Sequence, residues 1–86
     1  MKNLEFSARA NEDMTYWAKN DRKVAQRVVR LLEEIVAQLF AGMGKPELLK
    51  HELSGCWSRR VNREHRLVYK VEGNAIVILS CRYHYA

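Results

Sequence analysis

The stretch HRLVYKVEGNAIVILSCRYHY, residues 65–85, decides the fold. Two apolar, β-prone runs flank the dipeptide Gly73-Asn74, and this arrangement is typical of a β-hairpin closed by a two-residue turn. We therefore predict one strand over residues 65–72 and its antiparallel partner over residues 75–85. The residues expected on the buried face of the first strand are Leu67, Tyr69 and Val71.

Upstream of the hairpin, the apolar residues follow helical spacing. After Asp21 they recur three and four positions apart, which predicts an amphipathic helix that Asp21 caps and Gly42 stops. The stripe consists of Val24, Val28, Leu31, Leu32, Ile35 and Leu39. A shorter helix is predicted from Ala8 to about Lys19, with Ser7 as its N-cap.

The remaining segments complete an α+β fold. Residues 1–6 predict a short strand, and residues 56–62 predict another. The segment GMGKPELLK, residues 42–50, contains two glycines and Pro46, so we predict a loop there. The order of elements is therefore βααβββ, with the two N-terminal helices packed on a mainly antiparallel sheet.

The composition is that of a small folded protein. A chain of 86 residues is expected to form one domain, residues 1–86, and 48% of them are hydrophobic. The apolar runs are shorter than the roughly 20 residues that a membrane-spanning helix needs, and the N-terminus lacks the pattern of a signal peptide. We expect Cys56 and Cys81 to be buried thiols of a cytoplasmic protein, with a disulfide as the open alternative.

Positive charge is concentrated in the second half of the chain. The formal net charge is +5, and residues 44–86 contain eight Lys and Arg against four Asp and Glu. Such an excess favours an anionic partner, such as nucleic acid or an acidic protein. A basic surface that is merely solvated is the plainer alternative. His51 and His65 do not have the spacing of metal ligands, so a zinc site is not expected.

Six short motifs follow one another between residues 44 and 85: GKPE, LKH, LSG, WSRR, EHRLVY and CRYHY. In this order they resemble the YoeB (Txe) family of bacterial toxins, part of the wider RelE-like group. The resemblance implies the RelE-like α+β fold and a ribosome-dependent endoribonuclease, an mRNA interferase that cuts translated mRNA in the A site. It also implies a cognate antitoxin of the YefM type, frequent homodimers, and no metal or other cofactor.

The resemblance further implies roles for individual residues. Glu47, within GKPE, falls on the family's general base, and Arg66, within EHRLVY, falls on its transition-state cation. His84 and Tyr85, within CRYHY, fall on the general acid and its aromatic partner. The positions associated with RNA contacts are Lys50 and Arg60.

These residue types suit cleavage of RNA by its own 2′-hydroxyl without a metal. A base must remove the 2′ proton, a cation must stabilise the phosphorane oxygens, and an acid must protonate the departing 5′ oxygen. Glu47, Arg66 and His84 supply one candidate for each task. The expected products are a 2′,3′-cyclic phosphate and a 5′-hydroxyl.

The predicted hairpin register separates two of these candidates. With a two-residue turn, Arg66 lies opposite Cys81, and His84 points to the other face of the sheet. Arg66 and His84 can share a site only if the turn is longer, if a bulge intervenes, or if the last strand bends out near Arg82. We expect the bend.

Each candidate taken alone has a plainer explanation. Glu47 can be a solvated carboxylate, Arg66 can pair with Glu64, and His84 and Tyr85 can simply end a strand. Taken together and in this order, they favour the nuclease. Two alternatives on the same fold stay open: a ParE-like toxin that inhibits gyrase, whose group lacks the Glu, Arg and His-Tyr set, and a basic RNA-binding module without catalysis.

Overall fold

The computed structural model describes residues 2–83. Over this part of the chain, two α-helices, five strands and a short 3₁₀ helix follow in the order β1 (Asn3–Phe6), α1 (Ala8–Asn20), α2 (Arg22–Ala37), β2 (Glu47–Leu48), η1 (His51–Leu53), β3 (Trp57–Arg60), β4 (Arg66–Glu72) and β5 (Ala75–Ser80). The strands form one sheet in the order β1-β5-β4-β3-β2. β1 runs parallel to β5, and the other neighbours are antiparallel.

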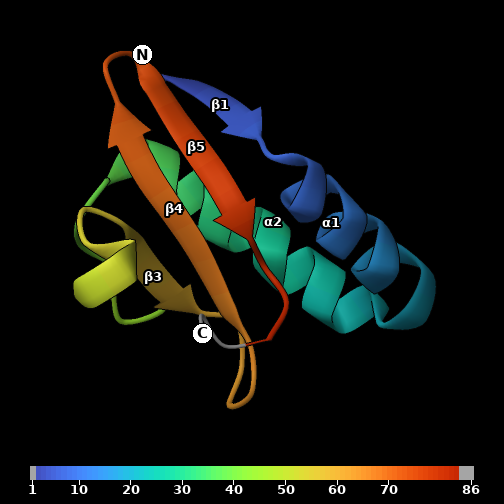
Figure 1. The fold of residues 1–86 in the computed structure, drawn as a ribbon. Helices are drawn as coiled ribbons and strands as arrows, with labels where there is room; N and C mark the ends of the chain where they lie inside the picture. Colours follow the sequence, from blue (N-terminus) through green and yellow to red (C-terminus); the bar gives the residue numbers. More distant parts are fainter. Residues whose placement is uncertain (1, 84–86) are drawn as a thin grey trace.

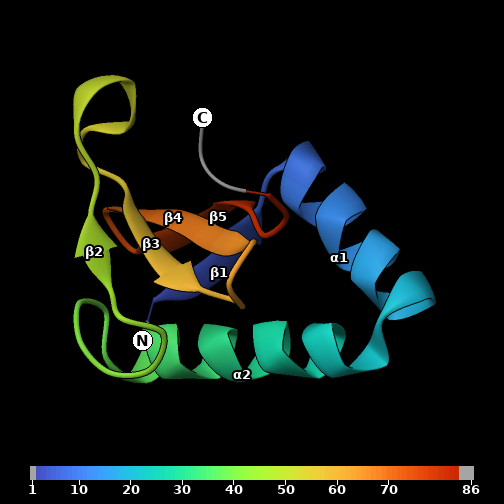
Figure 2. The same ribbon diagram turned by 90° about the horizontal axis from the view of Figure 1, so that it is seen from below.

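Both α-helices pack on the same face of this sheet (Figure 1, Figure 2). α2 runs along the sheet, and α1 lies beside it near β1 and β5. The main core lies between the helices and the sheet, and its buried residues include Val28, Leu31, Leu32, Ile35, Leu67, Tyr69, Ile76 and Ile78. A smaller cluster on the other face is formed by Leu49, Cys56 and Val68. Neither α1 nor α2 is long and apolar enough to cross a membrane.

The predicted fold class is confirmed, and so are the signals that start both helices. The Ser7 hydroxyl accepts a hydrogen bond from the Ala10 N–H at 3.0 Å. The Asp21 carboxylate accepts one from the Val24 N–H at 3.2 Å. Each cap satisfies a backbone donor that the first helical turn leaves without a partner, which is why these residues start the helices. Both cysteines are buried and free, as predicted.

The hairpin is confirmed, with a two-residue turn between β4 and β5, but its register shifts further along. Tyr69 pairs with Ile78 whereas Val68 pairs with Ser80, so one extra residue of β5 forms a β-bulge. β5 then ends at Ser80, short of its predicted end. Residues 81–83 are outside the strand because side chains from elsewhere in the fold bind their backbone groups.

The predicted end of the second helix is wrong. α2 ends at Ala37, well before Gly42. The buried Arg59 guanidinium donates to the carbonyl groups of Gln38 and Ala41. These bonds hold the following residues in a conformation that does not continue the helix.

The segment predicted as a loop also needs correction. Residues 42–50 contain β2, which pairs with β3 and forms one edge of the sheet. A strand of two residues is too short for sequence periodicity to reveal. The other predicted strands are present, although several are shorter at their ends.

Candidate active site

Strand pairing places the candidate residues of the sheet on one face. Tyr69 of β4 is buried under the helices, so Arg66, three positions away, points to the opposite side. Arg60 of β3 pairs directly with Arg66, and Glu47 of β2 pairs with Ser58, two residues before Arg60. We call this side the open face of the sheet because neither α-helix covers it, although Ser58 and Val68 are themselves buried there. Its residues are Glu47, Ser58, Arg60, Arg66, Val68 and Ser80.

Glu47 of the edge strand β2 and Arg66 of β4 lie on the same face of the sheet. They lie two strands apart with an offset of two residues, which separates their Cα atoms by about 12 Å. Both side chains are long and leave the same face of the sheet. Arg60 faces Arg66 directly, and two like charges in this position favour an anionic ligand.

The Arg66 guanidinium is held by the turn that precedes β4. Its Nη1 donates to the carbonyl groups of Asn62 at 2.8 Å and His65 at 3.0 Å. It does not pair with Glu64, the partner that the sequence offered as an alternative. Within the described part of the chain, the Nη2 and Nε groups of Arg66 have no acceptor, so they can donate to an anion.

Lys50 lies just after β2, close to Glu47. Residues 47–53 line a cavity of about 370 Å³, and both Glu47 and Lys50 are exposed. The Lys50 ammonium is therefore accessible to an anionic ligand at the β2 edge of the sheet. Glu47, Arg60 and Arg66 thus lie on one face of the sheet, and Lys50 follows its edge strand β2 by two residues.

The predicted residues His84 and Tyr85 lie outside the described residues. Tyr83 is the last described residue, and its carbonyl oxygen accepts a hydrogen bond from the backbone N–H of Arg66 at 3.0 Å. The residue before His84 is therefore bonded to Arg66 itself. The bend expected after the last strand is present, and the bulge, which was an alternative to it, occurs as well.

Arg59, which the sequence analysis did not single out, organises the loop that leads to Glu47. Its side chain is fully buried, with Nη1 donating to the Met43 carbonyl at 3.1 Å and Nε donating to the Tyr69 hydroxyl at 3.2 Å. Strand alternation was the available signal, because an inward Trp57 implies an inward side chain two residues later.

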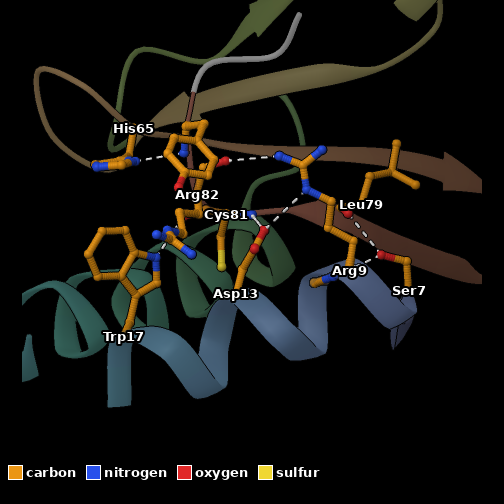
Figure 3. A network of polar contacts seen from close by, with 10 residues as sticks. Ser7, Arg9, Asp13, Trp17, His65, Leu79, Cys81 and Arg82 are labelled. Carbon is orange, nitrogen blue, oxygen red and sulfur yellow. Dashed lines mark hydrogen bonds and ion pairs between the residues drawn. The ribbon is translucent and has the colours of Figure 1, made fainter. Parts of the chain in front are cut away.

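A second group missed by the sequence analysis holds the chain after β5. Figure 3 shows α1 side chains that reach the backbone of this segment. The Asp13 carboxylate accepts a hydrogen bond from the Cys81 N–H at 3.0 Å, and the Trp17 Nε1–H donates to the Cys81 carbonyl at 2.9 Å. Asp13 follows Ala10 by three residues and precedes Trp17 by four. This spacing places the Asp13 carboxylate on the buried side of the helix, and it could have identified Asp13 from the sequence as a buried charge that needs a partner.

Cys81 makes the stability of this region depend on pH. Burial, with a further contribution from the Asp13 carboxylate, raises the pKa of the Cys81 thiol from 9.0 to about 12. The Cys81 thiol therefore ionises at a lower pH in the unfolded chain than in the folded protein. Its contribution to the free energy of unfolding is complete below about pH 9 and is lost towards about pH 12, at up to about 1.4 kcal/mol per pH unit.

Urea titrations at about pH 8 and about pH 10.5 measure this loss. We expect the free energy of unfolding to fall more in the wild-type protein than in Cys81→Ala. Burial also raises the pKa of Tyr69, which contributes to both proteins alike. An equal loss in the two proteins would contradict the effect of Cys81.

Known proteins match this chain along nearly its whole length. The family model described as "YoeB-like toxin of bacterial type II toxin-antitoxin system" matches residues 6–85. A Mycobacterium bovis protein named Toxin YoeB is 48% identical over 85 residues, which cover 99% of this chain and 100% of the relative.

Solved structures agree with the sequence relatives. A structure described as a YoeB/ParE toxin from Agrobacterium tumefaciens has a TM-score of 0.94 and 37% identity, and covers 99% of this chain and 100% of its own. A YoeB dimer from Staphylococcus aureus has a TM-score of 0.89 at 48% identity, covering 98% of both chains. A heterotetrameric YoeB-YefM toxin-antitoxin complex from the same species has a TM-score of 0.88 at 48% identity, covering 99% of both chains.

The family match spans almost the entire chain, and the relatives are similar over their full length as well as in fold. The chain belongs to the YoeB-like toxins of bacterial type II toxin–antitoxin systems.

Proposed function

We propose that this toxin is a ribosome-dependent mRNA endonuclease that cuts translated message in the A site and so inhibits translation in the cytoplasm. One observation carries the proposal. Glu47 and Arg66 share the open face of the sheet, and the backbone of Tyr83, the residue before His84, is bonded to Arg66. This arrangement supports a carboxylate, a guanidinium and an imidazole acting on one phosphodiester.

In the proposed reaction, Glu47 takes the proton from the 2′-hydroxyl as the 2′ oxygen attacks the adjacent phosphorus. The Nη2 and Nε groups of Arg66, which have no acceptor among residues 2–83, stabilise the negative oxygens of the phosphorane. His84 gives a proton to the 5′ oxygen as the bond from phosphorus to that oxygen breaks. The products are a 2′,3′-cyclic phosphate and a 5′-hydroxyl, and no metal or other cofactor takes part.

The RNA contacts follow from charge and from aromatic surface. Lys50 and Arg60 flank the proposed centre with exposed positive charges, so they suit the phosphates on either side of the scissile bond. Tyr85 is proposed to stack on an unpaired base, because aromatic rings hold single-stranded nucleotides in this way. The ribosome supplies the rest of the surface that positions the message.

The proposed protein partners follow from the solved relatives. The S. aureus structures show YoeB as a dimer and in a complex with YefM. We propose that an antitoxin of the YefM type binds and silences this toxin, and that the toxin forms a homodimer.

Cleavage of message on programmed ribosomes tests the function. Wild-type toxin is expected to cut at the A-site codon, and Glu47→Gln to cut about 10²-fold more slowly, because the amide cannot accept the 2′ proton. His84→Ala is expected to lose activity to a similar extent. Thermal unfolding of each variant controls for the fold.

The same experiment also tests the alternative functions, gyrase inhibition and binding without catalysis. An intact message in the presence of wild-type toxin, together with inhibition of DNA supercoiling by gyrase, would contradict the nuclease and favour a ParE-like inhibitor. Binding of ribosomes or RNA without any cut would instead favour a non-catalytic binding module.

A further inference from the structure

The segment after β5 is held mainly by side chains, together with one backbone hydrogen bond from Arg66 of β4 to the Tyr83 carbonyl. The Ser7 hydroxyl donates to the Leu79 carbonyl at 2.8 Å, and Arg9 Nη2 donates to the Arg82 carbonyl at 3.3 Å. With the bonds from Asp13 and Trp17 to Cys81, α1 and its N-cap contact three of the residues that follow the bulge or form it (Figure 3). Backbone N–H and C=O groups that leave a sheet normally form hydrogen bonds with water. In this segment, side chains of α1 take the place of water and fix the position of the backbone.

Asp13 gives the strongest evidence that the position of this backbone is fixed. Its carboxylate is buried, which is costly for a charged group unless hydrogen bonds compensate. The compensation comes from the Cys81 N–H and from Arg9, whose Nε lies 3.7 Å from the carboxylate. The buried charge is thus used to fix a backbone group of the C-terminal segment.

His65 extends the contact to the other side of the segment. Its Nδ1 accepts a hydrogen bond from the Tyr83 N–H at 2.6 Å, so in this arrangement the proton of a neutral ring is on Nε2. The Trp17 ring packs edge-on against the His65 ring, with 4.8 Å between their centroids. Cys81 and Tyr83 are therefore held by two aromatic side chains that also contact each other.

Tyr83 has a backbone conformation that these contacts explain. Its φ of 67° lies in the left-handed region, which is unfavourable for an aromatic residue and is kept only where the surroundings determine it. The surroundings do so here, because His65 binds its N–H and the Arg66 N–H binds its carbonyl. Tyr83 directly precedes His84 in the sequence.

We propose that Asp13, Trp17 and His65 are positioning residues for His84. They fix the backbone of residues 81–83 beside Arg66 and so determine where the general acid enters the site. This inference rests on the proposed function, in which His84 protonates the leaving 5′ oxygen. A purely structural role would affect every step of the reaction, whereas a positioning role affects the protonation step.

A message with sulfur in place of the scissile 5′ oxygen separates these two roles. The 2′ oxygen still attacks phosphorus and its proton still goes to Glu47. The phosphorus–sulfur bond breaks and the sulfur leaves with the bonding electron pair as a thiolate, which needs no acid because thiols ionise far more readily than alcohols. Cleavage of this message therefore reports the reaction without its general acid.

The informative substitution is His65→Phe, which keeps a ring against Trp17 but removes the acceptor for the Tyr83 N–H. We expect its maximal rate on ordinary message to fall by about 10²-fold, because small displacements of a catalytic group have effects of this size. Its affinity for the ribosome and its rate on the sulfur message are expected to stay near wild type. His65→Asn, whose amide oxygen can replace Nδ1, is expected to recover much of the loss.

Two further variants complete the design. Trp17→Phe removes the donor to Cys81 while keeping an aromatic ring. It is expected to show the same selective loss, and it tests the positioning role on its own if His65→Phe does not fold. Glu12→Gln, an exposed carboxylate beside Asp13 on α1, is the control and is expected to behave as wild type.

The outcomes separate this inference from the proposed function. Suppose that His84→Ala loses cleavage rate only on ordinary message, as proposed. If folded His65→Phe and Trp17→Phe then lose rate equally on both messages, or on neither, the positioning role is overturned and the role of His84 stands. If His84→Ala cuts ordinary message at the wild-type rate, the assignment of His84 as the acid fails, and the inference fails with it.

Discussion

Arg66→Ala is expected to slow cleavage of message on the ribosome by about 10³-fold or more, which is the size of effect that a cation has when it stabilises charge on a transferring phosphoryl group. The reason is local. Arg66 is anchored through Nη1 to the carbonyl groups of Asn62 and His65, and its Nη2 and Nε groups have no acceptor in the described chain. A cation fixed in advance needs no reorganisation when charge develops.

Single-turnover rates with saturating ribosomes measure this effect. Arg66→Lys keeps the charge but loses the planar pair of donors, so we expect an intermediate rate. Arg30→Ala removes the same charge from the exposed side of α2, away from the open face, and serves as the control. If Arg66→Ala is slowed no more than Arg30→Ala, Arg66 is not the transition-state cation.

Arg59→Met is expected to lower the free energy of unfolding by about 3–5 kcal/mol, because the replacement removes the one donor that three partly buried carbonyl groups and the Tyr69 hydroxyl share. Arg59 is fully buried and binds the chain between α2 and β2 at Gln38, Ala41 and Met43. Small domains are stable by only about 5–15 kcal/mol, so this loss would bring the protein close to unfolding at ordinary temperatures.

The adjacent residue supplies the matched control. Arg60→Met makes the same chemical change one position along the strand, where the side chain is exposed on the open face, and is expected to change stability by about 0.5 kcal/mol or less. Urea unfolding of both variants decides the matter. Similar midpoints for the two would show that the buried guanidinium does not hold the loop.

The hairpin and the helix caps could be predicted because each depends on residues close together in the chain. Gly73-Asn74 determines its turn locally, and Ser7 and Asp21 bind N–H groups only three residues away. The stripe on α2 is a local pattern of the same kind. It could not show where that helix ends, because a distant arginine determines the end.

The rest depends on contacts between distant segments. The bonds from Trp17 and Asp13 to Cys81 join residues 64 and 68 positions apart, and a propensity pattern carries no record of such a pairing. The bulge in β5 is one extra residue in an otherwise regular apolar run, with no glycine to mark it.

The residues of the candidate site also differ in whether local sequence or tertiary pairing determines their position. Alternation along the strands could place Arg60 and Arg66 on one face from the sequence. Glu47 joins them only because β2 pairs with β3, and a two-residue strand in a glycine-rich loop gives no signal of its own. The family resemblance supplied Glu47 as a candidate, and the tertiary fold supplies its location.

Attack by the 2′-hydroxyl is tested with a message that lacks one atom, the 2′ oxygen of the nucleotide at the scissile bond. We expect wild-type toxin to cut ordinary message in the A site to a 2′,3′-cyclic phosphate and a 5′-hydroxyl. We expect no detectable cut at the same bond when that nucleotide is 2′-deoxy. Cleavage of the 2′-deoxy message at an undiminished rate, or a 5′-phosphate at the cut, would contradict this mechanism, because another nucleophile would then have attacked the phosphorus.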